Sequence, residues 1–131
     1  MTHRIHAQYR LDSGSHSGIY WRGRYEMQVV GDMGAPVSPT SHMSVYGRVA
    51  PLVNASVPDN DWNTMEGVIV GNKITVTLNG KRVHDNTTLP GITGNALDAN
   101  ELEPGPVMLV GNDGKLWYRR VTVTPITDTR R

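Results

Sequence analysis

Apolar and polar residues alternate with a period of two along most of the chain, and this alternation predicts β-strands. In residues 5–11 every second side chain is apolar, the pattern of a strand with one face in a core and one in water. A second region of this kind covers residues 18–30 and is interrupted at Gly23. After that glycine, the alternation places two sets of side chains on opposite faces of one strand. One set is Tyr25, Met27 and Val29, and the other is Arg24, Glu26 and Gln28.

The middle of the chain carries two hairpin signals. Three strand patterns follow one another, joined by Gly-Asn at 71–72 and Asn-Gly at 79–80; they cover residues 65–70, 73–78 and 81–84. Asn-Gly suits a type I′ turn, because both central residues of that turn need a positive φ. We therefore predict consecutive antiparallel strands here, with Ile74, Val76 and Leu78 facing inward.

The remaining patterns complete an all-β prediction. Further short strands are expected at residues 43–49, 107–110 and 116–126, and loops at residues 31–40, 51–61 and 86–103. No ten-residue segment combines helical periodicity with a plausible cap. About seven short strands separated by turns predict a sandwich or a barrel. We expect one domain over residues 1–126 and a polar tail over 127–131.

Composition narrows the classes of protein further. The 131 residues are 37% hydrophobic, enough for one compact domain. The absence of cysteine excludes a disulfide framework, a thiolate metal site and a cysteine nucleophile. Thirteen basic and twelve acidic residues give a net charge of +1, too balanced for a protein that binds nucleic acid by neutralising phosphates. No apolar run approaches the ~18 residues that a membrane span needs, and residues 1–10 lack the unbroken apolar stretch of a signal peptide.

The polar face of the strand after Gly23 is the first candidate site. Arg24, Glu26 and Gln28 follow one another at intervals of roughly 7 Å. A guanidinium, a carboxylate and a carboxamide in a row can donate and accept hydrogen bonds along the edge of a sugar ring. The alternative is an ordinary solvated strand face on which Arg24 pairs with Glu26.

Aromatic and histidine residues give weaker signals. Trp21, Trp62 and Trp117 could stack on pyranose rings, but a chain without phenylalanine also needs large aromatic residues for its core. The five histidines show no zinc-ligand spacing. A composite site that includes His6 and Glu26 stays open, because neighbouring strands lie only ~5 Å apart.

Four blocks of sequence together resemble one known family. Residues 17–29, SGIYWRGRYEMQV, resemble the signature "NSGI-aromatic-x-RG-x-YE-x-Q" of the bacterial 3-keto-disaccharide hydrolase family. Three further blocks agree with the family in order and spacing. They are YG with AP within 46–51, WNTME at 62–66 with GNKITVTLNG at 71–80, and GPVML at 105–109 with GKLWYR at 114–119.

This resemblance implies a fold, an activity and roles for residues. The fold would be a concanavalin A-like jelly-roll sandwich of two antiparallel sheets, and the ligand a carbohydrate. Family members act on 3-keto-glycosides, in which the ketone acidifies C2–H so that the aglycone leaves by elimination before water adds. Glu26 would be the base or a metal ligand, with Gln28 and Arg24 as its catalytic partners. The residues expected to bind substrate are Arg22, Arg119, Trp21, Trp62 and His6.

The resemblance has departures that keep a second function open. The family's usual Asn, Asp, Gln and His are replaced here by His16, Gly31, Val110 and Asn112. A non-catalytic carbohydrate-binding module of lectin type is therefore the alternative. The residues themselves imply no cofactor, whereas the family chemistry leaves room for a divalent metal, Ca²⁺ or Mg²⁺. Relatives are often periplasmic or secreted, and the compartment of this chain stays undetermined.

Relatives generally begin with further strands, so the resemblance implies that this sequence starts at a later strand and is either an incomplete fragment or a sheet that another chain completes. An uncovered sheet edge is a liability that proteins usually cover. We therefore expect a homo-oligomer, most simply a dimer, in which a second copy completes the sheet.

Overall fold

The computed structural model describes residues 2–11, 15–22, 24–58, 60–93, 108–110 and 116–125. Within these residues all the helix or strand structure is β-strand. The strands are β1 (Thr2–Leu11), β2 (His16–Trp21), β3 (Tyr25–Val30), β4 (Trp62–Val70), β5 (Lys73–Leu78), β6 (Lys81–Thr88), β7 (Met108–Val110) and β8 (Leu116–Pro125).

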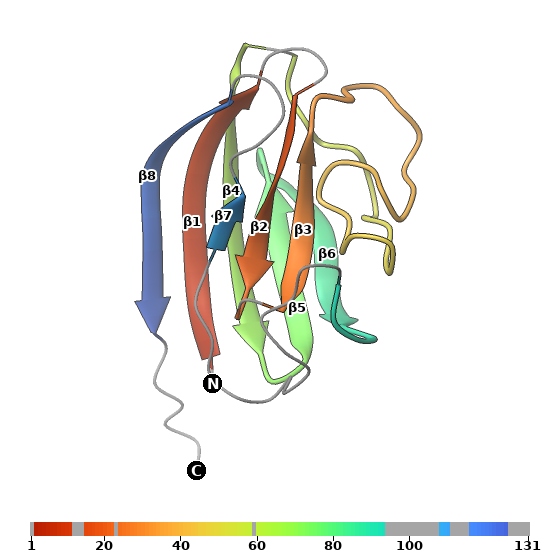
Figure 1. The fold of residues 1–131 in the computed structure, drawn as a ribbon, viewed down its shortest axis with the longest axis vertical. Helices are drawn as coiled ribbons and strands as arrows, with labels where there is room; N and C mark the ends of the chain where they lie inside the picture. The colour runs from red at the N-terminus through yellow and green to blue at the C-terminus, as the bar shows by residue number, and fades with distance from the viewer. Residues whose placement is uncertain are drawn as a thin grey trace.

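The strands form two antiparallel sheets that pack face to face (Figure 1). The larger sheet has the order β6-β5-β4-β1-β8, and the smaller has the order β3-β2-β7. Both the β1–β4 and the β1–β8 pairs are antiparallel, although β8 follows β1 by more than a hundred residues. The predicted all-β sandwich is confirmed.

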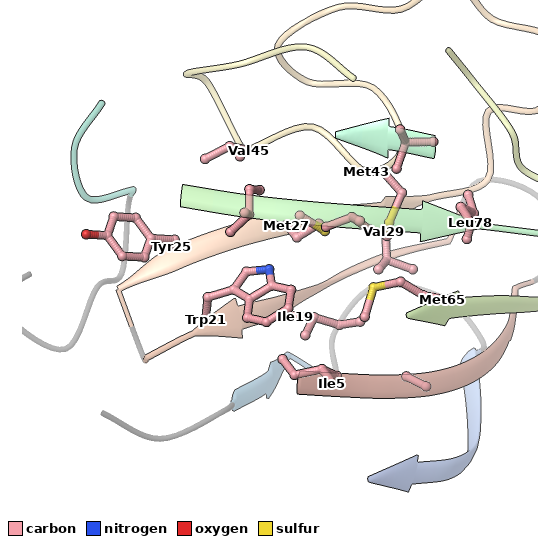
Figure 2. Close-up of a cluster of buried hydrophobic side chains, with 14 of the residues drawn as sticks. Ile5, Ile19, Trp21, Tyr25, Met27, Val29, Met43, Val45, Met65 and Leu78 are labelled. Carbon is pink, nitrogen blue, oxygen red and sulfur yellow. The ribbon is translucent and has the colours of Figure 1, made fainter. Parts of the chain in front are cut away.

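The core lies between the inner faces of the two sheets (Figure 2). Ile5, Ala7 and Tyr9 of β1 face it from the larger sheet, and Ile19, Trp21, Met27 and Val29 from the smaller one; all are fully buried. Trp21 fits because Gly67 of β4 has no side chain: a Cβ at Gly67 would lie 2.9 Å from the Trp21 ring. Large aromatic and methionine side chains therefore fill the volume that phenylalanine often occupies.

The hairpin between β5 and β6 forms as the sequence predicts. Asn79 and Gly80 both have positive φ, of 51° and 82°, as a type I′ turn requires. The Asn79 amide also donates to the carbonyl of Ala55 at 2.9 Å, and its Oδ1 accepts from the Thr64 N–H at 2.8 Å. The turn therefore also ties β4 to the loop that precedes it.

Several boundaries differ from the sequence prediction. β4 begins at Trp62 rather than at residue 65, and β6 continues to Thr88 across irregular pairing with β5. Asn86, with φ of 50°, lies in that irregular stretch, so no period of two is visible there. The strand expected at 43–49 is reduced to isolated bridges of Val45 with Met27 and Val49. Position 107 and most of the predicted loop 86–103 lie outside the described residues.

β8 is one of the two edge strands of the larger sheet within the described residues. Two of its side chains, Val121 and Val123, are 36% and 47% exposed. An apolar edge of this kind suits pairing with another chain. The dimer stays a prediction that light scattering of the protein in solution would test.

Candidate functional site

The outer face of the smaller sheet carries the predicted carboxylate and amide. In the β2–β3 pair, Tyr20 lies opposite Glu26 and Gly18 opposite Gln28. Because the neighbours of these residues point into the core, Tyr20, Glu26 and Gln28 lie on the outer face. His16, at the start of β2, belongs to the same face by the same alternation.

The Glu26 side chain lies directly across Gly18. A Cβ added at Gly18 would lie only 2.3 Å from the carboxylate Oε2 and 2.7 Å from Cγ of Glu26, closer than any real contact. The buried hydroxyl of Tyr20 donates a hydrogen bond to the same carboxylate. Gly18 therefore gives Glu26 the room to reach across β2.

Burial raises the pKa of Glu26 above its usual value, because water is partly excluded from the carboxylate. The hydrogen bond from Tyr20 and the charge of His16 act in the opposite direction, favouring the ionised form. A half-buried carboxyl with a raised pKa is suited to exchanging protons with a ligand nearer neutral pH.

Two loops fix the backbone of β3 on its free side. The Glu26 N–H donates to Thr93 Oγ1 at 2.7 Å, and the Glu26 carbonyl accepts from the Tyr46 N–H at 2.9 Å. The Gln28 carbonyl accepts from the Met43 N–H at 2.7 Å. The Gln28 side chain donates through Nε2 to the Thr40 carbonyl at 3.3 Å. The loop after β3 thus acts as an irregular fourth strand beside the candidate site (Figure 1).

Two buried histidines hold this loop in place. His42 Nδ1 donates to the Val30 carbonyl at 2.6 Å, which leaves Nε2 to accept from the Tyr9 hydroxyl at 2.6 Å. His84 Nε2 donates to the Met43 carbonyl at 2.6 Å. Burial lowers the pKa of both imidazoles, although their backbone hydrogen bonds partly oppose the shift. The neutral histidines therefore position the segment that pairs with β3.

Arg24 is not the solvated residue on a strand face that the alternation alone suggests. It precedes the first residue of β3, is only 2% exposed, and donates through Nη1 to the Arg22 carbonyl at 3.2 Å. Arg22 is fully buried, and a positive φ of 52° turns the chain at the end of β2. Both arginines are thus part of the buried connection between β2 and β3.

The other predicted binding residues lie elsewhere. Trp21 is fully buried in the core, where its ring stacks on His3 at 5.6 Å, so it offers no platform for a sugar. His6, Trp62 and Arg119 belong to β1, β4 and β8 of the larger sheet, on its outer face. The two sheets and the core separate these three from Glu26. Of the predicted site residues, Glu26 and Gln28 lie together on the outer face of the smaller sheet.

The residues that sequence reasoning missed are Tyr20, Gly18 and Thr93. The sequence could have identified Tyr20 and Gly18, because pairing β2 with β3 in a hairpin and alternating the faces places both residues beside the Glu26 strand. Thr93 has none, because it comes from a loop far along the chain. Asp32, next to the family's usual aspartate position, lies outside the site: its carboxylate accepts from the His42 N–H and the Asn54 amide.

A divalent metal does not fit the described part of this site. Within the described residues, no three histidine or acidic side chains gather in a group that could hold an ion. The described side chains of this face are those of His16, Tyr20, Glu26 and Gln28, and Glu26 carries the single carboxylate of this set. Ca²⁺ and Mg²⁺ need several oxygen ligands. No step is therefore assigned to a metal.

Comparison with known proteins decides the family. The model of the 3-keto-alpha-glucoside-1,2-lyase-like domain matches residues 2–124. The chain belongs to this family. No curated protein matches it.

Solved structures show the same architecture. Three similar ones, each titled a "putative glycosyl hydrolase", come from Parabacteroides distasonis ATCC 8503. The first has 22% identity and a TM-score of 0.80, covering 95% of this chain and 64% of its own. The second has 19% identity and a TM-score of 0.73, covering 95% and 78%. The third has 12% identity and a TM-score of 0.74, covering 96% and 72%.

These comparisons settle the fold at the level predicted from the sequence. The chain is a jelly-roll sandwich of two antiparallel sheets, and it spans 64% of the length of the first of these structures. Within its described residues, no helix has the length and apolar character to cross a bilayer.

Proposed function

We propose that the outer face of the smaller sheet binds a 3-keto-glycoside and that Glu26 acts there as the base of a 1,2-elimination. Family membership supports the substrate class. The observation that carries the proposal is the Glu26 carboxylate, which lies across Gly18, accepts from the Tyr20 hydroxyl and has its pKa raised by burial.

The elimination removes a proton from C2, breaks the C1–O bond and protonates the leaving oxygen. The Glu26 carboxylate takes the C2 proton, which the C3 ketone has acidified, and the freed electron pair forms a C1=C2 double bond as the C1–O bond breaks. The aglycone oxygen takes a proton from solvent water and leaves as an alcohol, and protonated Glu26 returns its proton to the hydroxide that this forms. The products are an unsaturated ketose and the free alcohol, so atoms and charge balance. Water then adds to the double bond to give the 3-keto-sugar.

Neighbouring groups have supporting roles in this scheme. Tyr20 donates to the Glu26 carboxylate, which keeps more of it ionised and aims it. Gln28, on the same face and half-buried, offers an amide to the sugar hydroxyls. The shared chemistry is general base catalysis, which typically contributes 10²–10⁴-fold to a rate.

The test is the release of p-nitrophenol from a p-nitrophenyl 3-keto-glucoside. We expect release by the wild-type protein and a loss of about 10²–10⁴-fold in kcat/KM for Glu26→Gln. Asp85→Asn is the matched control, because it neutralises an exposed carboxylate on β6 that pairs with Arg82. No release by the wild type, or equal rates for the two variants, would contradict the proposal.

A non-catalytic sugar-binding module is the second candidate, and one position favours it. Val110, where the family usually has glutamine, pairs with Gly18 directly beside the Glu26 side chain. If relatives use that glutamine in catalysis, its replacement supports binding without cleavage. Calorimetric titration of the 3-keto-glucoside distinguishes the two: heat of binding without release of p-nitrophenol indicates the module.

A further inference from the structure

The outer face of the larger sheet carries a second, independent arrangement of polar and aromatic residues. In the strand register Arg10 lies between Trp62 of β4 and Trp117 of β8. In the next outward-facing row, Gln8 lies between Thr64 and Arg119. Because Tyr9 between these rows is fully buried, both rows face away from the core.

These residues form a stacked ladder of guanidinium groups and indole rings. The Arg119 guanidinium lies 3.8 Å from the centre of the Trp62 ring, and that of Arg10 lies 4.2 Å from Trp117 and 5.6 Å from Trp62. Arg119 Nε also donates to Gln8 Oε1 at 2.9 Å, and the Gln8 amide donates to Thr64 Oγ1 at 3.2 Å. The ladder therefore fixes both guanidiniums before any ligand arrives.

The charges of this face are unevenly compensated. Arg4 pairs with Glu66 at 3.6 Å, and Arg82 pairs with Asp85 at 3.3 Å. Neither Arg10 nor Arg119 forms an ion pair with a carboxylate in the described part of the chain. Among the described residues, two fixed guanidiniums without a carboxylate partner thus lie at the β8 side of the sheet, where Trp117 is 38% exposed.

A shallow hollow continues the same face beyond the ladder. It has a volume of about 300 Å³, and its lining includes the Arg4–Glu66 ion pair, Arg82 and the side chains of Thr75 and Thr77. Threonine hydroxyls both donate and accept hydrogen bonds. The face therefore combines the two stacked guanidiniums, an exposed indole, threonine hydroxyls and arginines that are paired with carboxylates.

We propose that this face, which we call the Arg–Trp face (Arg10, Trp62, Trp117, Arg119), binds an acidic saccharide chain that carries uronate carboxylates. The planar guanidiniums of Arg10 and Arg119 match carboxylates in charge and geometry. The exposed Trp117 ring supplies an apolar surface for the sugar ring, and the threonines of the hollow take the hydroxyls of neighbouring units. The site is separate from the Glu26 site, because the two lie on opposite outer surfaces of the sandwich.

The chemistry of the face favours a saccharide over other polyanions. An acidic peptide would pair with the two guanidiniums, but it would not contact the indole ring or the threonine hydroxyls of the hollow as a sugar would. Nucleic acid is disfavoured because most of the arginine charge beyond the ladder is already neutralised by Glu66 and Asp85. Both remain as outcomes of the experiment.

The test is calorimetric titration of the full chain with tetragalacturonate, cellotetraose, a polyglutamate peptide and a DNA duplex. We expect binding of tetragalacturonate that weakens with added salt, and no binding of the neutral cellotetraose. Arg10→Gln and Arg119→Gln are each expected to weaken binding at least about tenfold, since each removes a charge-assisted contact. Arg119→Lys keeps the charge but not the planar fork, and an intermediate loss is expected.

The matched control is Arg48→Gln, which removes a guanidinium from the loop beside β3, where it donates to the Ile92 carbonyl. It is expected to bind tetragalacturonate as the wild type does, and thermal unfolding shows that each variant is folded. Equal loss in Arg48→Gln, or binding of polyglutamate or DNA as tight as that of tetragalacturonate, would overturn the proposal. So would the absence of tetragalacturonate binding by the wild type. None of these results depends on Glu26, so the proposed elimination stands or fails separately.

Discussion

The two outer faces of the sandwich are built by the same alternation but offer different chemistry. On the smaller sheet, a single carboxylate lies against a glycine, and its burial raises the pKa of Glu26. On the larger sheet, the comparable carboxylate Glu66 is more than half exposed and pairs with Arg4, and stacked arginines dominate the surface. The difference teaches that the covering of a polar side chain, more than its presence on a strand, decides whether it can do proton chemistry.

Among changes that keep Glu26 itself, filling the space beside it is expected to have the largest effect. Gly18→Ala places a methyl group where the carboxylate now lies, so Glu26 must move, and a displacement of about 1 Å can cost about 10²-fold in rate. The measurement is kcat/KM for release of p-nitrophenol from the 3-keto-glucoside. Gly91→Ala is the control, because a Cβ at Gly91 meets nothing within 4 Å. Similar rates for both variants would show that Glu26 need not lie across β2.

Removing the Tyr20 hydroxyl is expected to have a smaller effect that depends on pH. Its hydrogen bond lowers the pKa of Glu26, so Tyr20→Phe raises that pKa further and moves the acid limb of the rate profile to higher pH. On the acid side we expect a loss of about tenfold. Tyr46→Phe, which alters an exposed tyrosine, serves as the control. An unshifted acid limb would mean that Glu26 is not the titrating base.

Lowering the pH is expected to destabilise the loop that pairs with β3 of the smaller sheet. Burial lowers the pKa of His42 and His84 in the folded protein from the ordinary value of 6.5. As the pH falls below about 6.5, the unfolded chain binds protons that the folded chain does not, so stability is lost. Urea unfolding at pH 7.5 and 5.5 measures the loss, and His84→Gln should reduce it.

Hydrogen exchange locates that loss within the molecule. The amides of Met43 and Tyr46, which pair with β3, should become less protected at pH 5.5 than those in the β1–β4 pair. Equal loss of protection in both regions, or an unchanged urea difference in His84→Gln, would contradict a local role for the buried histidines.

The smallest effect is expected for the exposed carboxylate of the larger sheet. Glu66→Gln breaks the Arg4 ion pair, and exposed pairs of this kind contribute about 0–1 kcal/mol to stability. Thermal unfolding should shift by a few degrees at most, and turnover at Glu26 should not change. A large loss of turnover would mean that the two faces are coupled and would contradict their treatment as independent surfaces.

Sequence pattern alone was enough to predict much of the fold. The period of two located most strands, Asn79 and Gly80 predicted their turn, and the alternation after Gly23 put Glu26 and Gln28 on one face. These features are local, because a strand's two faces and a tight turn depend on residues next to one another. The same locality explains why the alternation does not predict the burial of Arg24, which lies just before β3 begins and is buried with Arg22 in the connection.

Tertiary structure decided which faces belong together. Periodicity shows that His6, Trp62 and Arg119 avoid the core, but not that they lie on a different sheet from Glu26. That assignment depends on β1 pairing with β4 and β8, strands far apart in the chain. The contact of Thr93 with the Glu26 N–H spans 67 residues and also has no local signal. Local chemistry determined the strands, and only long-range pairing and packing, which no short window of sequence contains, determined the sites.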